Sequence, residues 1–401
     1  MEVADILCAR GSDYRRAHRG HLSLGQLKVM SAIERCRTAE LGGHRLHCSK
    51  CDTDTIAYNS CRNRHCPKCQ SSAAERWLEA RQADLLPIDY YHVVFTLPEG
   101  LREIAYQNKR LVYDLMFKTV SETLLTIAAD PKYLGAKVGI TAVLHTWGSS
   151  LVHHPHIHCI VTGGGLAPRR NRWIACRPNF FVPVKVLSRL FRRRFLEALQ
   201  KAYDDGQLKF FGELKLLEDP AWFAEHLRPL KAIDWVVYAK RPFAGPQAVL
   251  TYLSRYTHRV AISNRRLVAF TDDQVTFRYK DYREKGQHRW KSMTLDTDEF
   301  IRRFLQHVLP KGLHRIRHYG LYANAQRNDN LKLARALLEQ PDRKTPIKEV
   351  TAEPASSDDV PSDGTPQCAY TCRRCGASLI IIETLLPEPT ARAPPLQRWA
   401  A

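Results

Sequence analysis

Residues 153–165, with the sequence HHPHIHCIVTGGG, constrain the fold of this chain more than any other stretch. The apolar residues after the histidines predict a strand, in which alternate side chains point to the same face. His156 and His158 therefore share one face, while Ile157 points to the other. Pro155 suits the start of a strand because it lacks a backbone N–H, and the three glycines predict a loop after it. The sequence thus places two imidazoles on one wall of a sheet.

Four histidines fall within six consecutive positions of this stretch. A lone pair of histidines on a strand is usually an ordinary hydrogen-bonded pair, because short motifs recur by chance. Neutral imidazole is, however, the commonest side-chain metal ligand near pH 7. The density of histidines therefore favours a metal site over the ordinary pair.

The charge of the chain narrows the class of partner. A formal net charge of +20 indicates a polyanion, for which nucleic acid is the leading candidate and an acidic membrane surface the weaker one. The chain has 401 residues, 44% of them hydrophobic, which is enough for two or three domains with a buried core. It opens without a secretory signal, and no apolar run approaches the roughly 18 residues of a spanning helix. We therefore expect a cytoplasmic protein that does not enter a membrane.

The 12 cysteines are expected to be zinc ligands rather than disulfides, because a reducing cytosol keeps thiols free. Two Cys-x-x-Cys pairs, Cys48 with Cys51 and Cys66 with Cys69, are separated by fourteen residues. This spacing predicts one structural Zn²⁺ held by four thiolates, with no open position for chemistry.

The ligand types around these pairs leave a second zinc site open. Its candidate ligands are Cys36, His44, Cys61 and His65. The alternative is that these four side chains are buried structural residues. Basic residues among the ligands are expected to contact DNA phosphates. They are Arg62, Arg64 and Lys68.

A third Cys-x-x-Cys pair lies near the C-terminus. Cys372 and Cys375, with Cys368 before them, precede an apolar run and look like half of a zinc ribbon. A fourth ligand is missing, so metal binding there stays open.

The pattern of apolar residues predicts an α+β protein with a central antiparallel sheet. The strands are expected at 90–97, 138–147, the histidine stretch and 234–239, and the helices at 98–128 and 186–203. Strand, helix, strand, strand is the start of a ferredoxin-like or RRM-like sheet with helices on one face. The other face is then available for a metal and a nucleic acid.

The remaining segments are assigned more briefly. A helix is expected at 26–37 and another at 71–86 before the sheet. A meander of short strands is expected after the sheet, and then a helix at 297–307; the strands lie at 260–263, 267–270, 275–282 and 288–295. The predicted domains are a zinc module at 1–86, a central domain at 87–340, a linker at 341–367 and a tail at 368–401.

Residues 247–256 are expected to form a helix that places Tyr252 and Tyr256 on one face, at i and i+4. Tyrosines at this spacing usually pack in a core or an interface. Arg255 and Arg259 lie beside them and are expected to contact a DNA phosphate.

Three motifs together resemble a known family. A hydrophobic residue between two histidines, as in His156-Ile157-His158, is the HUH signature of metal-dependent single-strand endonucleases. The pattern Tyr-x-x-x-Tyr-x-x-Arg and the cysteine-rich run 59–69 accompany it. This set resembles the rolling-circle transposases of the insertion-sequence family numbered ninety-one. The resemblance covers most of the chain, from the zinc module to the basic segment after the tyrosines.

The resemblance implies a bacterial DNA transposase in which Tyr252 and Tyr256 are the nucleophiles. His156 and His158 would hold a catalytic Mg²⁺ or Mn²⁺. The third ligand would be His154, which shares their face by parity, or His145 on the neighbouring strand. The substrate would be single-stranded or unwound DNA at insertion-sequence ends, cleaved to a 5′-phosphotyrosine and a free 3′-OH.

Two other functions and two other nucleophiles stay open. A plasmid replication initiator or relaxase would use the same chemistry on another substrate, and a zinc-dependent DNA-binding regulator would have an inert site. Tyr319 and Tyr322 are rival nucleophiles without the helical spacing.

Overall fold

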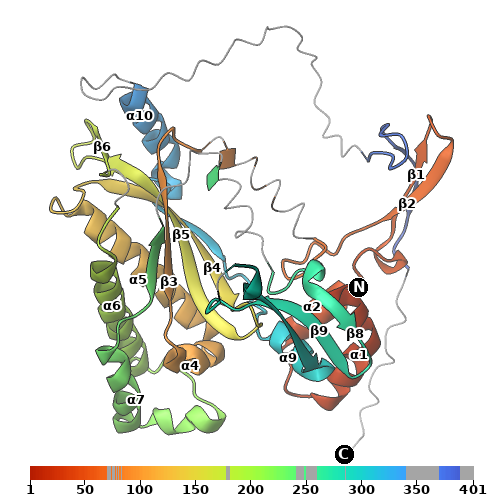
Figure 1. Ribbon diagram of the computed structural model, residues 1–401, viewed down its shortest axis with the longest axis horizontal. Helices are drawn as coiled ribbons and strands as arrows, with labels where there is room; N and C mark the ends of the chain where they lie inside the picture. The colour runs from red at the N-terminus through yellow and green to blue at the C-terminus, as the bar shows by residue number, and fades with distance from the viewer. Residues whose placement is uncertain are drawn as a thin grey trace, which may run out of the picture. The chain divides into compact units, whose positions relative to one another are not determined.

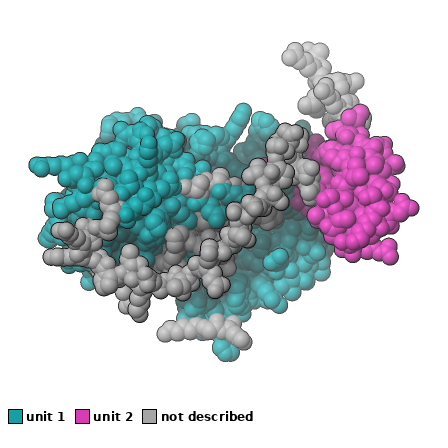
Figure 2. Space-filling model, turned by 90° about the horizontal axis from the view of Figure 1, so that it is seen from above, with its two compact units in different colours: residues 1–34, 63–340 teal, residues 35–62, 341–401 magenta. Residues whose placement is uncertain are grey.

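The computed structural model describes residues 1–69, 74, 77, 79, 81–82, 84–177, 181–240, 248–249, 260–284, 286–339 and 370–388. The chain forms two compact units, coloured separately in Figure 2. Unit 1 comprises residues 1–34 and 63–340, and unit 2 comprises residues 35–62 and 341–401. None of the described helices combines the length and apolar character needed to cross a membrane.

Unit 1 is built around an antiparallel sheet of six strands. Their order is β11-β4-β5-β3-β7, and β6 pairs with one end of β5. The strands are β3 (Tyr90–Thr96), β4 (Lys137–Trp147), β5 (His153–Leu166), β6 (Trp173–Ala175), β7 (Val237–Lys240) and β11 (Ile316–Gly320).

Along the chain, four strands and the helices between them follow the expected order of strand, helix, strand, strand, helix, strand, and β6 and β11 are two further strands that were not predicted. The helices are α4 (Arg102–Gln107), α5 (Lys109–Ala129), α6 (Val184–Asp204) and α7 (Pro220–Ala232). Figure 1 shows α5 and α6 on the same side of the sheet, where α5 contacts both α6 and β4. The predicted α+β class, with an antiparallel ferredoxin-like sheet and helices on one face, is confirmed.

The helix predicted at 98–128 is interrupted. A short 3-10 turn and α4 precede Asn108, where the backbone leaves helical geometry with φ −118° and ψ 41°. The Asn108 side chain donates to the carbonyl of Lys209 and accepts from its N–H, both at 2.8 Å. A polar side chain that competes for backbone hydrogen bonds favours a break over a continuous helix.

The two faces of the sheet carry different kinds of side chain. The side chains of Phe95, Leu144 and Ile157 are buried against the helices, and Phe95 meets Phe191 of α6 edge to face with ring centroids 5.1 Å apart. The opposite face carries the histidines. Period-two alternation along the strands therefore separates an apolar core from a face that holds polar chemistry.

A smaller antiparallel sheet in unit 1 has the order β10-β9-β8. Its strands are β8 (Leu267–Phe270), β9 (Gln274–Lys280) and β10 (Trp290–Asp296), followed by α9 (Thr297–Leu305). The predicted meander is confirmed, except that residues 260–263 form no strand and have a bend at 261–262. Helices α1 (Val3–Ala17) and α2 (Leu24–Glu34) pack together, and α1 contacts α9.

The remaining elements of unit 1 are short or peripheral. Helix α10 (Arg327–Glu339) follows β11. The described 3-10 turns of unit 1 are η2 (Glu99–Leu101), η3 (Gly212–Glu218), η4 (Asn264–Arg266), η5 (Gly286–Arg289) and η6 (Asn324–Gln326).

Unit 2 joins the two ends of the sequence in a single sheet of order β12-β1-β2. The 3-10 turn η1 (Ala39–Leu41) leads into β1 (Gly43–Cys48) and β2 (Thr53–Tyr58), and β12 (Ile380–Leu385) comes from the C-terminal segment. A Cβ at Gly42 would lie 2.4 Å from the carbonyl oxygen of Leu385. Glycine before β1 therefore permits the C-terminal strand to approach.

The apolar face makes a measurable contribution to stability. We expect Phe95→Ala to lower the free energy of unfolding of unit 1 by about 3 to 5 kcal/mol, because it leaves a cavity against Phe191. Tyr238→Ala on the neighbouring strand β7 is the control, since that side chain is 51% exposed. Urea unfolding followed by intrinsic fluorescence measures both, and equal losses would contradict this account of the two faces.

Candidate functional site

Three imidazoles meet on the face of the large sheet opposite α5 and α6. His145 of β4 lies directly opposite His156 of β5 in the strand register, and His158 is two residues further along β5. One ligand nitrogen from each ring lies within 4.8 Å of the other two. The rings come from two adjacent strands, so the geometry depends on the pairing of β4 with β5.

The structure distinguishes the two candidates for a third partner. His145 belongs to the group, and its ring centroid is 4.5 Å from that of His158. His154 shares strand parity but is not in the group, and it contributes its backbone carbonyl instead. The expectation that His154 could complete the set is therefore not supported by the geometry, because β5 carries it toward the end of the strand.

Hydrogen bonds orient two of the three rings. Nδ1 of His156 donates to the carbonyl oxygen of His154 at 2.7 Å, which fixes the proton on Nδ1 and the lone pair on Nε2. His92 of β3 lies parallel to His158, and Nε2 of His92 is 2.9 Å from Nδ1 of His158. When Nδ1 of His158 is the donor, the free lone pair of the ring lies on Nε2, which is the atom that would bind a metal.

Sequence reasoning missed His92. Burial, with a smaller effect of Lys240, lowers the pKa of His92 to about 3, so the ring is neutral at pH 7 and can accept a hydrogen bond. The sequence does contain a signal for His92, because it lies in the middle of an apolar strand. A polar side chain that is buried there needs a hydrogen-bond partner.

The chain packs on the same face of the sheet just before the predicted tyrosines. Val249 is fully buried against Tyr90 and Ile160, and Ile160 follows His158 by two residues on the same face of β5. Tyr252 comes three residues after Val249. Tyr252, Arg255, Tyr256 and Arg259 themselves lie outside the described residues.

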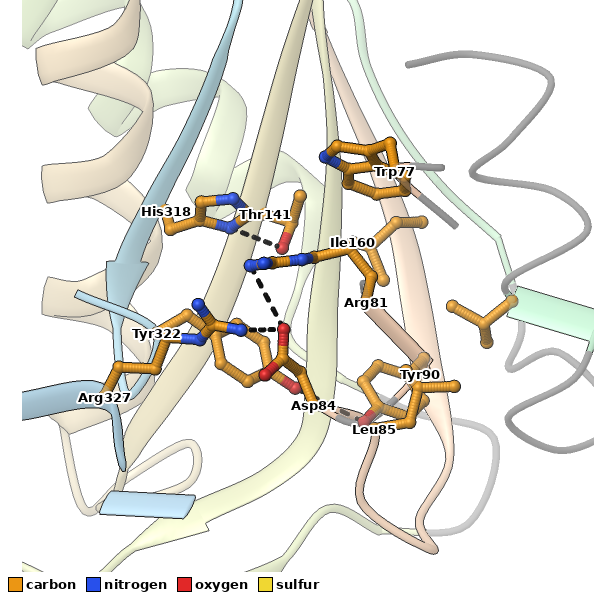
Figure 3. Close-up of a pocket in the computed structure, with 11 residues that line it drawn as sticks. Trp77, Arg81, Asp84, Leu85, Tyr90, Thr141, Ile160, His318, Tyr322 and Arg327 are labelled. Carbon is orange, nitrogen blue, oxygen red and sulfur yellow. Dashed lines mark hydrogen bonds and ion pairs between the residues drawn. The ribbon is translucent and has the colours of Figure 1, made fainter. Parts of the chain in front are cut away.

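A small pocket lies further along this face (Figure 3). Arg81 and Arg327 both pair with Asp84, at 3.1 Å for Arg81. On the sheet side, Oγ1 of Thr141 is 3.1 Å from Nδ1 of His318, whose pKa burial lowers to about 4. Two guanidinium groups beside one carboxylate give this cluster a net positive charge, which favours binding of an anionic group.

The rival tyrosines occupy unsuitable positions. Tyr322 is buried, and its hydroxyl oxygen is 3.3 Å from that of Tyr90. Tyr319 of β11 pairs with Ile140 and packs against the core on the helix-covered face, away from the histidines. Neither hydroxyl is presented to the three imidazoles in this structure.

The structure groups the zinc-ligand candidates differently from the spacing argument. Cys48 and Cys51 lie with Cys372 and Cys375, and their four sulfur atoms are all within 4.8 Å of one another. The predicted set of Cys48, Cys51, Cys66 and Cys69 is therefore corrected. The physical reason is that β12 pairs with β1, and a tetrahedral site filled by the C-terminal pair has no place for two further thiolates.

Backbone N–H groups prepare this cysteine group for a cation. Hydrogen bonds from the N–H groups of Cys375 and Arg374 lower the pKa of Cys372 to about 6. The hydrogen bond with Cys375, and then desolvation, raise the pKa of Cys51 to about 12. Crowded thiols resist ionising together, and a divalent cation would offset that resistance.

Cys36 and Cys61 of the predicted second set lie together in unit 2, where the N–H of Cys61 points to the Cys36 sulfur at 3.5 Å. The two histidines of that set have other partners. Nε2 of His65 accepts from the Leu309 N–H at 3.4 Å, and Nδ1 of His44 lies 3.4 Å from the Thr384 hydroxyl. Within unit 2, the structure therefore brings together the two cysteines of the predicted second set.

The three basic residues near these cysteines differ in whether their side chains are already bonded within the protein. Arg64 donates to the carbonyls of Leu313 at 2.6 Å and Pro310 at 2.8 Å, so its geometry favours a structural role over phosphate contact. Lys68 forms an ion pair with Glu2. Arg62 is exposed, and its contact with phosphates stays a prediction.

Comparisons with known proteins agree with the two parts of the site. A transposase zinc-binding domain model matches residues 6–97, and a model described as a putative transposase matches residues 139–330. The second range contains the three histidines. No solved structure matches the chain at a significant level.

Curated relatives extend these matches over most of the chain. It is 59% identical over 337 residues to a putative transposase, y4qJ, of Sinorhizobium fredii, covering 84% of each chain. It is 28% identical over 311 residues to the transposase of insertion sequence element IS801 from Pseudomonas savastanoi pv. phaseolicola, covering 75% of this chain and 70% of that protein. The chain therefore belongs to the IS91 family of insertion-sequence transposases.

Proposed function

We propose that this transposase cleaves and rejoins single-stranded DNA at insertion-sequence ends by attack of a tyrosine hydroxyl on a phosphodiester. The observation that carries the proposal is the meeting of His145, His156 and His158 on one face of the sheet. A cluster of imidazoles on one face, in a chain of net charge +20, suits metal-assisted chemistry on a phosphate backbone.

The proposed reaction exchanges one phosphodiester for another. The phenolic oxygen of Tyr252 or Tyr256 bonds to phosphorus, and the bond from phosphorus to the 3′ oxygen breaks. The tyrosine loses its proton and the departing 3′ oxygen gains one, giving a 5′-phosphotyrosine and a free 3′-OH. Because no water is consumed, a 3′-OH can reverse the step and rejoin a strand. A second tyrosine permits a second transfer before the first is released.

The three histidines are the proposed holders of the catalytic cation. Imidazole nitrogen suits Mn²⁺ better than Mg²⁺, whereas Mg²⁺ is the more abundant ion in cells. When bound, the cation would polarise the scissile phosphate. The hydrogen bond of His156 to the His154 carbonyl and the pairing of His92 with His158 hold the rings in orientation.

The position of Val249 supports the assignment of the nucleophiles. Its burial against Ile160 brings the chain onto the histidine face three residues before Tyr252. A tyrosine hydroxyl has a pKa of about 10, so only about one in a thousand is ionised at pH 7. The site must therefore accelerate the reaction by holding the hydroxyl in line with the phosphate. Arg255 and Arg259 are proposed to hold the phosphate in that position.

DNA contacts are proposed along the same face. The pocket of Figure 3 places Arg81 and Arg327 beyond Ile160. A separate phosphate contact is proposed for Arg62, which is exposed in unit 2. Most protein–DNA affinity comes from such contacts with phosphates and carries little sequence information.

Two alternatives predict different outcomes. A replication initiator or relaxase would form the same covalent species on plasmid origins rather than on insertion-sequence ends. A zinc-dependent regulator would bind DNA and form no covalent species. The family membership favours the transposase over both.

We expect the double variant Tyr252→Phe/Tyr256→Phe to bind DNA normally and to form no covalent adduct, because only the hydroxyls are removed. Each single variant should support at most one of the two transfers. The measurement is a denaturing gel after incubation with labelled single-stranded element ends and Mn²⁺. Tyr319→Phe is the matched control and should form the adduct. An adduct in the double variant would place the nucleophile elsewhere.

The third ligand can be identified by a matched pair of variants. His145→Ala should reduce cleavage at least about 100-fold, whereas His154→Ala should cleave at near the wild-type rate. His156→Ala and His158→Ala should behave like His145→Ala. All four should bind DNA within a few-fold of wild type, because affinity depends on many phosphate contacts. Loss of cleavage in His154→Ala alone would reverse the assignment.

His92 is expected to act as a positioning residue. His92→Phe keeps an aromatic ring beside His158 but removes the hydrogen bond, so the Mn²⁺ concentration for half-maximal cleavage should rise about 10- to 100-fold. Cleavage at saturating Mn²⁺ should recover most of its rate. A proportional loss at every Mn²⁺ concentration would indicate a general structural role instead.

A further inference from the structure

We propose that the C-terminal tail supplies half of a structural zinc site, in which Cys372 and Cys375 complete a tetrahedral set with Cys48 and Cys51. The zinc-binding domain match ends at residue 97, so none of the comparisons assigns the tail a role. All four cysteines lie in unit 2.

The distances between the sulfur atoms fit a single zinc ion. A tetrahedral site with Zn–S bonds of about 2.3 Å has sulfur atoms about 3.8 Å apart. The sulfur atoms of Cys48 and Cys375, which come from opposite ends of the sequence, are 3.6 Å apart. All four cysteines are free thiols, so no disulfide accounts for their approach.

In both Cys-x-x-Cys turns, the residue directly after the second cysteine has a positive φ. Asp52, directly after Cys51, has φ +50°, and Gly376, directly after Cys375, has φ +73°. In the C-terminal turn the Gly376 N–H donates to the Cys372 carbonyl at 2.8 Å, and the Cys372 N–H donates to the Ala377 carbonyl at 2.7 Å. Each turn therefore points its two sulfur atoms to a common point, as a zinc knuckle does.

Strand pairing brings the second turn to the first. Residues of β12 pair with β1 from Gly43 opposite Leu385 to His47 opposite Ile380. Cys48 is the last residue of β1, and the C-terminal turn immediately precedes β12. The end of one strand and the start of the other thus place the two turns together.

Unit 2 buries little apolar surface that could stabilise its fold. Among its described residues, Leu46 is the one buried apolar side chain that is not a cysteine. Ile380 and Ile381 on β12 remain 55% and 50% exposed. A sheet of three short strands without a core depends on metal ligation for stability. The zinc module that begins near residue 35 would therefore be complete only when the segment with Cys372 and Cys375 has been made.

The test compares the zinc content of full-length variants by atomic emission. Cys48→Ser/Cys51→Ser should lose one zinc equivalent, and Cys372→Ser/Cys375→Ser should lose the same one. The quadruple variant should therefore also lose one equivalent. Cys8→Ser/Cys176→Ser is the matched control and should lose none, since neither residue is in a cysteine group. Full zinc in the tail double variant, or loss of two equivalents in the quadruple variant, would overturn the proposal.

A second variant separates ligand loss from misfolding. Cys372→His keeps a side chain that can bind zinc, so it should retain the full zinc content. After cobalt replaces zinc, its thiolate-to-metal absorption should decrease and its ligand-field bands should shift relative to the wild type. An unchanged cobalt spectrum would show that residue 372 is not a ligand.

Discussion

The pairing of β4 with β5 determines the rest of this structure. It sets His145 opposite His156 and Val143 opposite His158, and on the reverse face it sets Leu144 opposite Ile157. A slip of one residue would move the apolar side chains to the histidine face and the histidines into the core. Burial of the apolar set therefore fixes the register, and the register brings three imidazoles from two strands together.

The two units reach stability by different means. In unit 1 the aromatic and aliphatic side chains of the sheet, α5 and α6 form one large core. Buried polar groups in this unit are hydrogen-bonded to one another, as Tyr113 is to His153 at 2.8 Å. Unit 2 buries cysteines and little other apolar surface, so we propose that metal ligation replaces burial as its source of stability.

Local patterns in the sequence predicted much of the fold and part of the site. The period-two alternation of 153–161 predicted the strand and the shared face of His156 and His158, because both follow from one segment. Apolar spacing likewise predicted α6 and the meander β8 to β10. The break at Asn108 was missed because its cause is a hydrogen bond with Lys209, about a hundred residues away.

The features that depend on distant pairing were not decidable from the sequence. Spacing left His145 and His154 equal as third partners until the register of β4 against β5 was known. The partners of Cys48 and Cys51 were misassigned because the nearest pair in sequence, Cys66 and Cys69, was preferred over a pair near the C-terminus. Arg64 looked like a phosphate contact because its carbonyl partners lie beyond residue 308.

The central claim is that a tyrosine from the segment after Val249 attacks DNA beside the three histidines. The most direct measurement is mass spectrometry of the peptide that carries DNA after reaction with single-stranded element ends and Mn²⁺, followed by nuclease and protease digestion. The account predicts a nucleotide on Tyr252 or Tyr256, and no modified peptide when Mn²⁺ is omitted. A nucleotide on Tyr319 or Tyr322, or an equal yield without a divalent cation, would contradict it.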